Sequence, residues 1–360
     1  MHLRYIYASL INTKGDNRDY MSTIRDVAKL ANVSTATVSR VLNNDTTYKM
    51  TDETRARVWH AVTELNYKFT SAAKSKQQTK IVTTEKSTIK VGCILSVTEK
   101  KYNDPYFMSI LNGVETQLRD KGYDIAFVKT GPEIEDKKNL FNTFSEPITG
   151  LILMVPLSDE TYQFIRQQVP YIVGIDTNRT DIDNVGYDHY NVSNIAVNHL
   201  IDKNHTKIGY IGGSGITGNI KESQRYRGYL SALHTAGLAL NPEWVIDCGW
   251  DEDKCISKVN HLIQSNNMPT AFFAASDLMA MAALSCLYDN GISVPGDVAV
   301  MGLSNIEVSK YSNPPLSTIE IPTKEIGMVA VNLLLARMEG DHLLPKKVIL
   351  PTALIQRSST

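Results

Sequence analysis

The sequence lacks any run of about eighteen apolar residues, the length that a membrane-spanning helix needs. It also has little cysteine. No CxxC or HExxH spacing and no histidine-rich cluster accompanies its four cysteines, which are Cys93, Cys248, Cys255 and Cys286. These absences argue against a membrane partner, a disulfide framework and a metal site, and they predict reduced thiols in a cytoplasmic protein. Residues 1–20 lack the pattern of a secretory signal, and we expect them to form a disordered extension.

Positive charge is scarce over most of the chain but concentrated near its start. Residues 21–80 carry ten Lys and Arg against five Asp and Glu, whereas the whole chain has a net charge of −1. A basic segment on an acidic remainder predicts that this segment, and not the whole chain, contacts a polyanion.

Three short helices are expected within this basic segment. Thr23 and Asp26 have the spacing of a capping box, and the first buried face that follows is Ile24, Val27, Ala28 and Ala31. Asn32 can adopt the left-handed conformation that a tight turn requires. Ser34 then caps a second helix, with Val33 and Val38 as a hydrophobic staple, and a third helix begins at Thr51.

The second helix, in "VSTATVSRVL", has an unusually smooth outer face made of Thr35, Ala36, Ser39 and Arg40. Two short helices joined by a tight turn predict a helix-turn-helix over residues 21–70. The DNA major groove admits a helix whose outer side chains are small, and one arginine can bind the two acceptors of a guanine. A plain three-helix bundle is the structural alternative.

The stretches "TIRDVAKLANVSTATVSRVLN" and "TRARVWHAVTELNY" resemble the head of the lactose-repressor/galactose-repressor family of bacterial transcription regulators. The resemblance implies that Thr35, Ala36 and Arg40 reach base edges. It also implies phosphate contacts by Thr23, Ser34, Thr37, Ser39 and Asn43. Two departures are Asn32, where the family has glycine, and a hinge without the usual leucine, where Ser75 and Lys76 stand instead. Lys74 and Lys76 would then bind the DNA backbone by charge.

Beyond a hinge and linker at 71–88, strand-like and helix-like segments alternate to the end of the chain. This pattern predicts an α/β fold with parallel sheets in two lobes over residues 89–360. The motifs "RYRGY", "VPGDVAVMG" and "PPLSTI" match the family, whose effector domain is like a periplasmic sugar-binding protein with three crossings between its lobes. We place the first lobe at about 89–188 and 320–350, and the second at about 189–319 and 351–360.

A rival pattern is the GxGxxG of "GGSGITG", which follows an expected strand. It raises the alternative of an NAD-binding oxidoreductase fused to a DNA-binding head. The next helix begins only near Ser223, Asp247 lies farther along than that fingerprint requires, and no catalytic pair accompanies the glycines. We therefore expect no enzyme activity, catalytic residue or cofactor.

A small ligand is expected at the carboxyl ends of the strands, where such folds bind their ligands. The polar and aromatic candidates there are Tyr106, Phe107, Asp176, Arg225, Trp250, Ser276, Asp277, Ser304 and Asn305. The alternatives are that Trp250 is a core aromatic, that Asp176 or Asp277 caps a helix, and that Arg225 forms a salt bridge between the lobes.

We therefore expect a homodimeric repressor that binds near-palindromic operator DNA and is released by a sugar. "NDPYF" and the unusual hinge look most like repressors of galactose and β-galactoside genes, so galactose or a galactoside is the expected effector. Two alternatives stay open: a co-repressor that strengthens DNA binding, and a constitutive architectural DNA binder whose body only dimerises.

Overall fold

The structure is a computed structural model that describes residues 22–42, 50–65, 67, 89–96, 104–213, 219–341 and 343–360. The chain divides into two compact units, Met1–Glu85 and Lys86–Thr360, and each is described by itself. The predicted extension at 1–20, the linker at 71–88, and the predicted phosphate contacts Asn43, Lys74 and Lys76 lie outside the described residues.

The first unit, the head, contains α1 (Ile24–Leu30), α2 (Thr35–Leu42) and α3 (Asp52–Glu64). The helices meet around one apolar cluster whose fully buried members include Val27, Val38 and Val58. Asn32 has a φ of 53°, which confirms the left-handed turn predicted between the first two helices. The three predicted helices are thus confirmed, and Val27, Ala28 and Ala31 of the predicted first face are buried.

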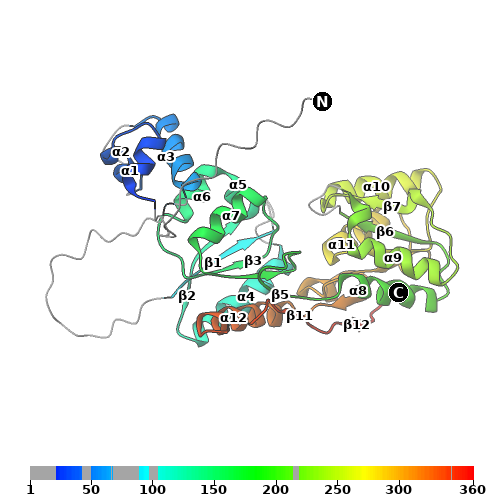
Figure 1. Ribbon diagram of the computed structural model, residues 1–360. Helices are drawn as coiled ribbons and strands as arrows, with labels where there is room; N and C mark the ends of the chain where they lie inside the picture. The colour runs from blue at the N-terminus through cyan, green and yellow to red at the C-terminus, as the bar shows by residue number, and fades with distance from the viewer. Residues whose placement is uncertain are drawn as a thin grey trace, which may run out of the picture. The chain divides into compact units, whose positions relative to one another are not determined.

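The second unit, the effector unit, begins with a six-stranded parallel sheet in the order β11-β5-β4-β3-β1-β2 (Figure 1). Its strands are β1 (Lys90–Leu95), β2 (Asp124–Thr130), β3 (Gly150–Leu153), β4 (Tyr171–Ile175), β5 (Asp183–Gly186) and β11 (Lys347–Ile349). Its helices are α4 (Pro105–Asp120), α5 (Gly131–Glu135), α6 (Lys137–Thr143), α7 (Asp159–Gln168) and α12 (Thr323–Met338). We call this part the first lobe.

Side-chain alternation along these strands explains why both faces of the sheet are covered. Val91 and Cys93 pack into the cluster shared with α4 and α12, whereas Ile94 packs into the cluster shared with α7. Successive side chains of a strand point to opposite faces, so apolar residues at consecutive positions require helices on both sides.

The second lobe has a four-stranded parallel sheet in the order β7-β6-β8-β9. Its strands are β6 (Ile208–Gly212), β7 (Val245–Asp247), β8 (Ala271–Ala274) and β9 (Ala299–Met301). Its helices are α8 (His189–Asp202), α9 (Gln224–Thr235), α10 (Glu252–Gln264) and α11 (Asp277–Asp289), with short 3-10 turns η2 (Ile220–Glu222), η3 (Pro242–Trp244) and η4 (Glu307–Tyr311). Phe273 faces the cluster that includes α8 and α9, and Phe272 faces the cluster of α10 and α11.

The chain passes between the lobes after β5, after β10 (Thr318–Glu320) and before β12 (Ala353–Ile355), and β10 and β12 pair antiparallel. The last residues finish in the second lobe, where the Ser359 hydroxyl donates to the carbonyl of Val300 (2.6 Å) and accepts from the amide of Ser317 (2.8 Å). The numerical lobe boundaries proposed from the sequence stay a prediction.

Neither β5 nor α8 was predicted from the sequence. Between them lies the segment Tyr187–Asp188, and Asp188 caps α8 by accepting from two amides. Among the described residues, no helix is both long and apolar enough to cross a membrane.

Candidate DNA interface and ligand site

The outer face of α2 carries mostly small side chains in the structure, as the sequence predicts. Thr35 and Ala36 are exposed and Arg40 is half-buried, while Val38, Val41 and Leu42 face the core of the head. The Ser34 hydroxyl accepts from the amide of Thr37 (3.0 Å), which confirms Ser34 as the cap of α2. The assignment of Thr35, Ala36 and Arg40 to base edges stays a prediction.

The phosphate contacts predicted for Thr23, Ser34, Thr37 and Ser39 are untested. The carboxylate of Asp26 accepts from both the amide (2.8 Å) and the hydroxyl (2.6 Å) of Thr23. These hydrogen bonds hold the pKa of Asp26 below its usual value. The proton of the Thr23 hydroxyl is therefore directed at Asp26, and Thr23 would have to break this bond to donate to a phosphate.

In the effector unit, Asp176 lies at the centre of contacts that join the two lobes. It follows β4, has a φ of 51°, and accepts from the Tyr106 hydroxyl (3.3 Å) at the start of α4. Its other oxygen lies 3.0 Å from Nε2 of His189, the first residue of α8. Phe107 packs edge-on against Tyr106 and into the apolar core beside it.

Arg225, near the start of α9, lies beside two aromatic rings. Its Nη2 donates to the Tyr187 hydroxyl (2.5 Å), and its guanidinium carbon lies 5.8 Å from the centre of the Tyr187 ring and 5.5 Å from that of Trp250. Among the described residues, the buried Nε of Arg225 finds no hydrogen-bond partner. The geometry thus brings Tyr106, Asp176, Arg225 and Trp250 together, as predicted from the strand ends, although their role as ligand contacts is untested.

Burial governs the titration of this cluster. It raises the pKa of Tyr106 and of Tyr187, and the neighbouring Asp176 carboxylate adds to the rise at both. Burial also lowers the pKa of His189, and the positive charge of Arg225 lowers it further, which outweighs the opposite effect of Asp176. At neutral pH the cluster therefore contains one fixed cation, Arg225, beside neutral phenols and a neutral imidazole.

Other predicted ligand residues have partners within the protein. Asp277 is 1% exposed, and its oxygens accept from the Ile306 amide (2.9 Å) and the Thr318 hydroxyl (2.6 Å). Ser276 caps α11 by accepting from the Met279 amide (3.3 Å). Ser276, and not Asp277, is therefore the cap of α11, and the Asp277 carboxylate is buried against Ile306 and Thr318; a ligand role for either residue stays a prediction.

The loop after β9 is also held internally. The Asn305 side chain accepts from Arg357 (2.7 Å) and donates to Glu320 (3.2 Å). Ser304 has a φ of 128° and donates its amide to the carbonyl of Ile319 (2.8 Å). Their geometry supports the joint between β9 and β10, and a ligand role for either residue stays a prediction.

Tyr187 and His189 were missed by the sequence reasoning. Their rings stack at 4.0 Å, and both touch residues of the predicted site. The available signal was the string "NVGYDHY", in which two polar aromatics follow a short strand. The string does not indicate a ligand site unless β5 is recognised as a strand, and β5 was not predicted.

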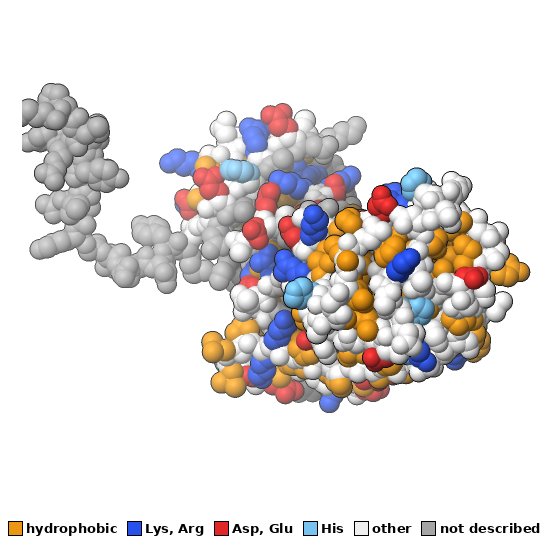
Figure 2. All heavy atoms as spheres, turned by 90° about the vertical axis from the view of Figure 1, so that its right-hand side faces the viewer, with side chains coloured by type: hydrophobic (Ala, Val, Ile, Leu, Met, Phe, Trp, Pro, Cys, Tyr) orange, Lys and Arg blue, Asp and Glu red, His pale blue; other side chains and the backbone are white. Residues whose placement is uncertain are grey.

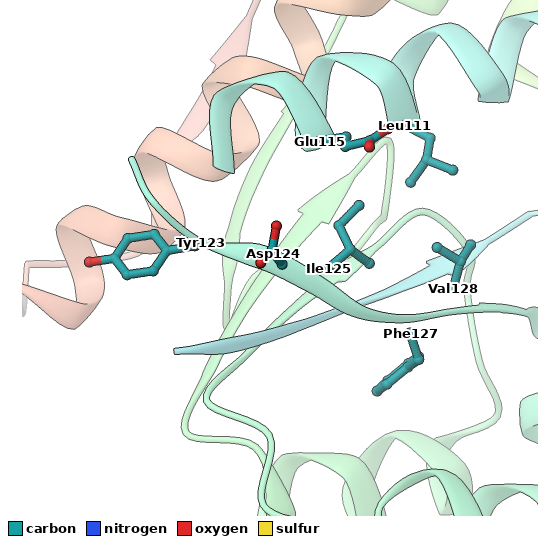
Figure 3. Close-up of a pocket in the computed structure, with 7 residues that line it drawn as sticks. All are labelled: Leu111, Glu115, Tyr123, Asp124, Ile125, Phe127 and Val128. Atoms are coloured by element: carbon teal, nitrogen blue, oxygen red, sulfur yellow. The ribbon is translucent and has the colours of Figure 1, made fainter. Parts of the chain in front are cut away.

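A separate hollow lies between α4 and the amino-terminal half of β2, away from the carboxyl ends of the strands. Figure 3 shows Leu111, Ile125 and Val128 turned into the space between helix and strand, with Phe127 on the other side of β2. Because β2 is the last strand of its sheet, this hollow adjoins an open edge.

Each of the two units matches a known protein family. Residues 23–68 match the model of bacterial regulatory proteins of the lacI family, and residues 197–360 match a periplasmic binding protein-like domain. The chain is 35% identical over 333 residues to the HTH-type transcriptional repressor PurR of Aliivibrio salmonicida, covering 89% of this chain and 94% of that protein. It is 32% identical over 348 residues to the ribose operon repressor of Haemophilus influenzae, covering 94% and 98%.

The solved structures agree. A complex of the transcriptional regulator CelR with cellobiose matches with a TM-score of 0.69 and 27% identity, covering 94% of this chain and all of that one. A lac repressor dimer bound to operator and an anti-inducer matches with a TM-score of 0.65 at 24% identity, which supports the fold. The chain therefore belongs to the lacI family of bacterial regulatory proteins, and it is a DNA-binding transcriptional repressor with a periplasmic-binding-protein-like effector domain.

Proposed function

We propose that a small ring-shaped ligand, bound between the lobes, sets the affinity of this repressor for its operator. The observation that carries the proposal is Arg225, a cation whose buried Nε has no partner among the described residues. Leaving such a donor unpaired costs about 1–3 kcal/mol, and a ligand oxygen would remove that cost.

The residues around Arg225 indicate the shape of the ligand. Trp250 offers a ring face beside the guanidinium, and Asp176 and Tyr106 offer polar atoms from the other lobe. A compact ring that carries oxygen atoms at its edge fits this combination of flat and polar surfaces. The ligand would bridge the two lobes and thereby fix their relative position.

We further propose that the ligand is a co-repressor, which strengthens operator binding. This alternative has more support from the relatives than release by galactose does. The relative reported above with the highest identity is named PurR, and neither curated relative reported above is named for galactose. The expectation of galactose is based only on the likeness of "NDPYF" and the hinge to those of galactose and β-galactoside repressors.

Release by a sugar is the second candidate. Arg225 beside Trp250 is a pairing that suits the hydroxyls and the C–H face of a sugar. The likeness to the CelR–cellobiose complex adds support for a sugar of some kind. The two candidates differ in the sign of the coupling, and in both the coupling must be reciprocal, so DNA changes ligand affinity by the same factor.

We also propose that the repressor acts as a homodimer on near-palindromic DNA and catalyses no reaction. The edge of the sheet at β2 and the hollow beside it offer one surface for a second copy. Figure 2, which views the second lobe, shows further hydrophobic side chains gathered on its surface. The α-helix that follows the GxGxxG begins only at Gln224, whereas in a dinucleotide site the helix begins at the glycines and its amino terminus binds the phosphates.

An operator shift assay tests this proposal. The full chain is titrated against its own promoter DNA, alone and with galactose, ribose, cellobiose, adenine or guanine at saturation. We expect one compound to tighten operator binding, and the others to leave it unchanged. Loosening by a sugar would replace co-repression with induction, and a DNA affinity that ignores every compound would favour the architectural DNA binder.

A further inference from the structure

Two buried polar atoms of the second lobe are without a hydrogen-bond partner among the described residues. One is Nε of Arg225 and the other is the hydroxyl of Tyr210, in β6. Tyr210 is 0% exposed, and its ring lies 5.4 Å from Tyr226, 5.3 Å from Tyr229 and 5.8 Å from Phe273. The aromatic surroundings explain the burial of the ring but offer nothing to its hydroxyl.

Both atoms belong to one neighbourhood at the start of α9. Arg225 is the second residue of this helix, and Ser223 is its cap, with a side chain that makes no capping hydrogen bond. Burial raises the pKa of Tyr210, while the Arg225 cation and the Ser223 hydroxyl act in the opposite direction, so both of these groups lie close to the Tyr210 hydroxyl. Three groups able to donate a hydrogen bond therefore converge on the positive end of a helix dipole, a place that favours an oxygen acceptor.

Glycines at the end of β6 allow the side chains of Tyr210 and Trp250 to pack directly against the backbone. A Cβ on Gly212 would come within 2.8 Å of the Tyr210 hydroxyl, and one on Gly213 would come within 2.5 Å of Nε1 of Trp250. Tyr210 is thus packed under the same backbone turn that Trp250 covers, and Trp250 in turn flanks Arg225.

We infer that Tyr210 is a ligand-selecting residue, whose hydroxyl joins Ser223 and Nε of Arg225 in binding one oxygen atom of the ligand. The oxygen acts as an acceptor and belongs to a hydroxyl, a carbonyl or a phosphate. This inference rests on the proposed function, because it requires a ligand in the cleft beside Arg225. The inference adds Tyr210, from β6 in the core of the second lobe, to the ligand site. It predicts that the protein rejects ligands that have no oxygen atom to place beside the Tyr210 hydroxyl.

The first experiment needs no ligand. Tyr210→Phe and Tyr229→Phe are compared by thermal unfolding of the full chain. Tyr229 is the matched control, since it is equally buried but its hydroxyl donates to the carbonyl of Ile208 (2.8 Å). We expect Tyr229→Phe to lower the midpoint of unfolding and Tyr210→Phe to leave it unchanged or raise it. Equal losses would show that the Tyr210 hydroxyl already has a partner, and would overturn the inference.

The second experiment measures ligand affinity by calorimetry for both variants and the unchanged chain. The probes are ribose, ribose 5-phosphate, galactose, cellobiose, adenine and guanine. For the probe that the unchanged chain binds most tightly, we expect Tyr210→Phe to weaken binding about tenfold and Tyr229→Phe to leave it unaltered. The ribose pair tells a neutral oxygen from a phosphate oxygen.

The two ideas can fail separately. Unaltered affinity of Tyr210→Phe, for a probe that does change operator binding, would refute the role of Tyr210 and leave the proposed function in place. If no probe changes operator binding by the unchanged chain, the proposed ligand control fails. The unfolding comparison then still decides whether the Tyr210 hydroxyl is unpartnered.

Discussion

Nε2 of His189 lies 3.0 Å from Oδ1 of Asp176, and this contact joins the first helix residue after the interlobe segment to the end of β4. The groups that face the imidazole are Asp176, Asp188, Tyr187 and Arg225. Burial and Arg225 together keep the pKa of His189 below its usual value of 6.5, so the folded protein holds the ring neutral.

Acid should therefore destabilise the effector unit through His189. The unfolded chain binds a proton near pH 6.5 while the folded chain resists it, so the free energy of unfolding falls as the pH drops below that value. Denaturant unfolding at about pH 7.5 and about pH 5.5 measures the loss. His189→Gln should show a smaller loss of stability than the unchanged chain, because it lacks the His189 imidazole. Some loss should remain, because His199 and His205, whose pKa values are also lowered, are present in both proteins. Identical losses would remove His189 as a contributor.

Gly113 of α4 and Gly327 of α12 allow these helices to touch backbone to backbone. A Cβ on Gly113 would lie 2.0 Å from the carbonyl oxygen of Lys324, and one on Gly327 would lie 2.2 Å from that of Ile110. Gly113→Ala should lower the free energy of unfolding by about 1–3 kcal/mol, since the helices must move apart. Gly296→Ala is the control, where the nearest atom, 2.8 Å away, is a side-chain hydroxyl of Ser293. A neutral Gly113→Ala would contradict the tight crossing.

Arg40 is predicted to bind base edges from α2. Arg40→Ala should cost about 1–3 kcal/mol of operator binding and relax specificity at one base pair in each half-site. Arg57→Ala removes the same charge from the exposed surface of α3 and should weaken all DNA sequences alike. Binding of operator and mutated operator by both variants makes the comparison. If Arg40→Ala weakens binding to the operator and to the mutated operator equally, as Arg57→Ala is expected to do, Arg40 does not contact base edges.

Ser34 has two predicted roles that one substitution separates. Ser34→Asp keeps an oxygen acceptor for the Thr37 amide, so the stability of the head should be retained. The added negative charge should weaken DNA binding if Ser34 lies against a phosphate. Ser34→Ala should instead lower stability by about 1 kcal/mol. Full DNA affinity in Ser34→Asp would assign Ser34 to capping alone.

Arg225 should control the response to ligand but not DNA binding itself. Arg225→Ala removes the cation beside Tyr187 and Trp250, so ligand should no longer change operator affinity, while operator affinity without ligand stays as before. The shift assay with and without ligand measures both. A normal ligand response would exclude Arg225 from the site.

Helix starts were predictable because their causes are local. Ser34, Asp136 and Ser158 each accept from an amide three residues ahead, and that pattern is visible in the sequence. The strand β5 was not predictable in this way. Its four residues include Asp183 and Asn184, which are buried in the structure. Asp183 accepts from Arg337, far along the chain, and Asn184 accepts from the Thr177 hydroxyl, and these tertiary partners cannot be inferred from the local sequence.

The same limit applies to the ligand site. Residues at strand ends could be listed, but the direction of a carboxylate depends on its tertiary neighbours. Asp176 points to the other lobe through His189, whereas Asp277 points inward to Ile306 and Thr318. Both follow a strand in similar sequence surroundings, and the distinction comes from the segments that pack against them.

The last residues of the chain complete the packing of both lobes, and this affects the order in which the lobes can fold during synthesis. The edge strand β11, residues 347–349, closes the first sheet, and Ser359 is buried against Val300 and Ser317 in the second lobe. Neither lobe can reach its final packing until residues 347–360 have been synthesised. A tag or truncation at Ser359 would therefore disturb the second lobe directly.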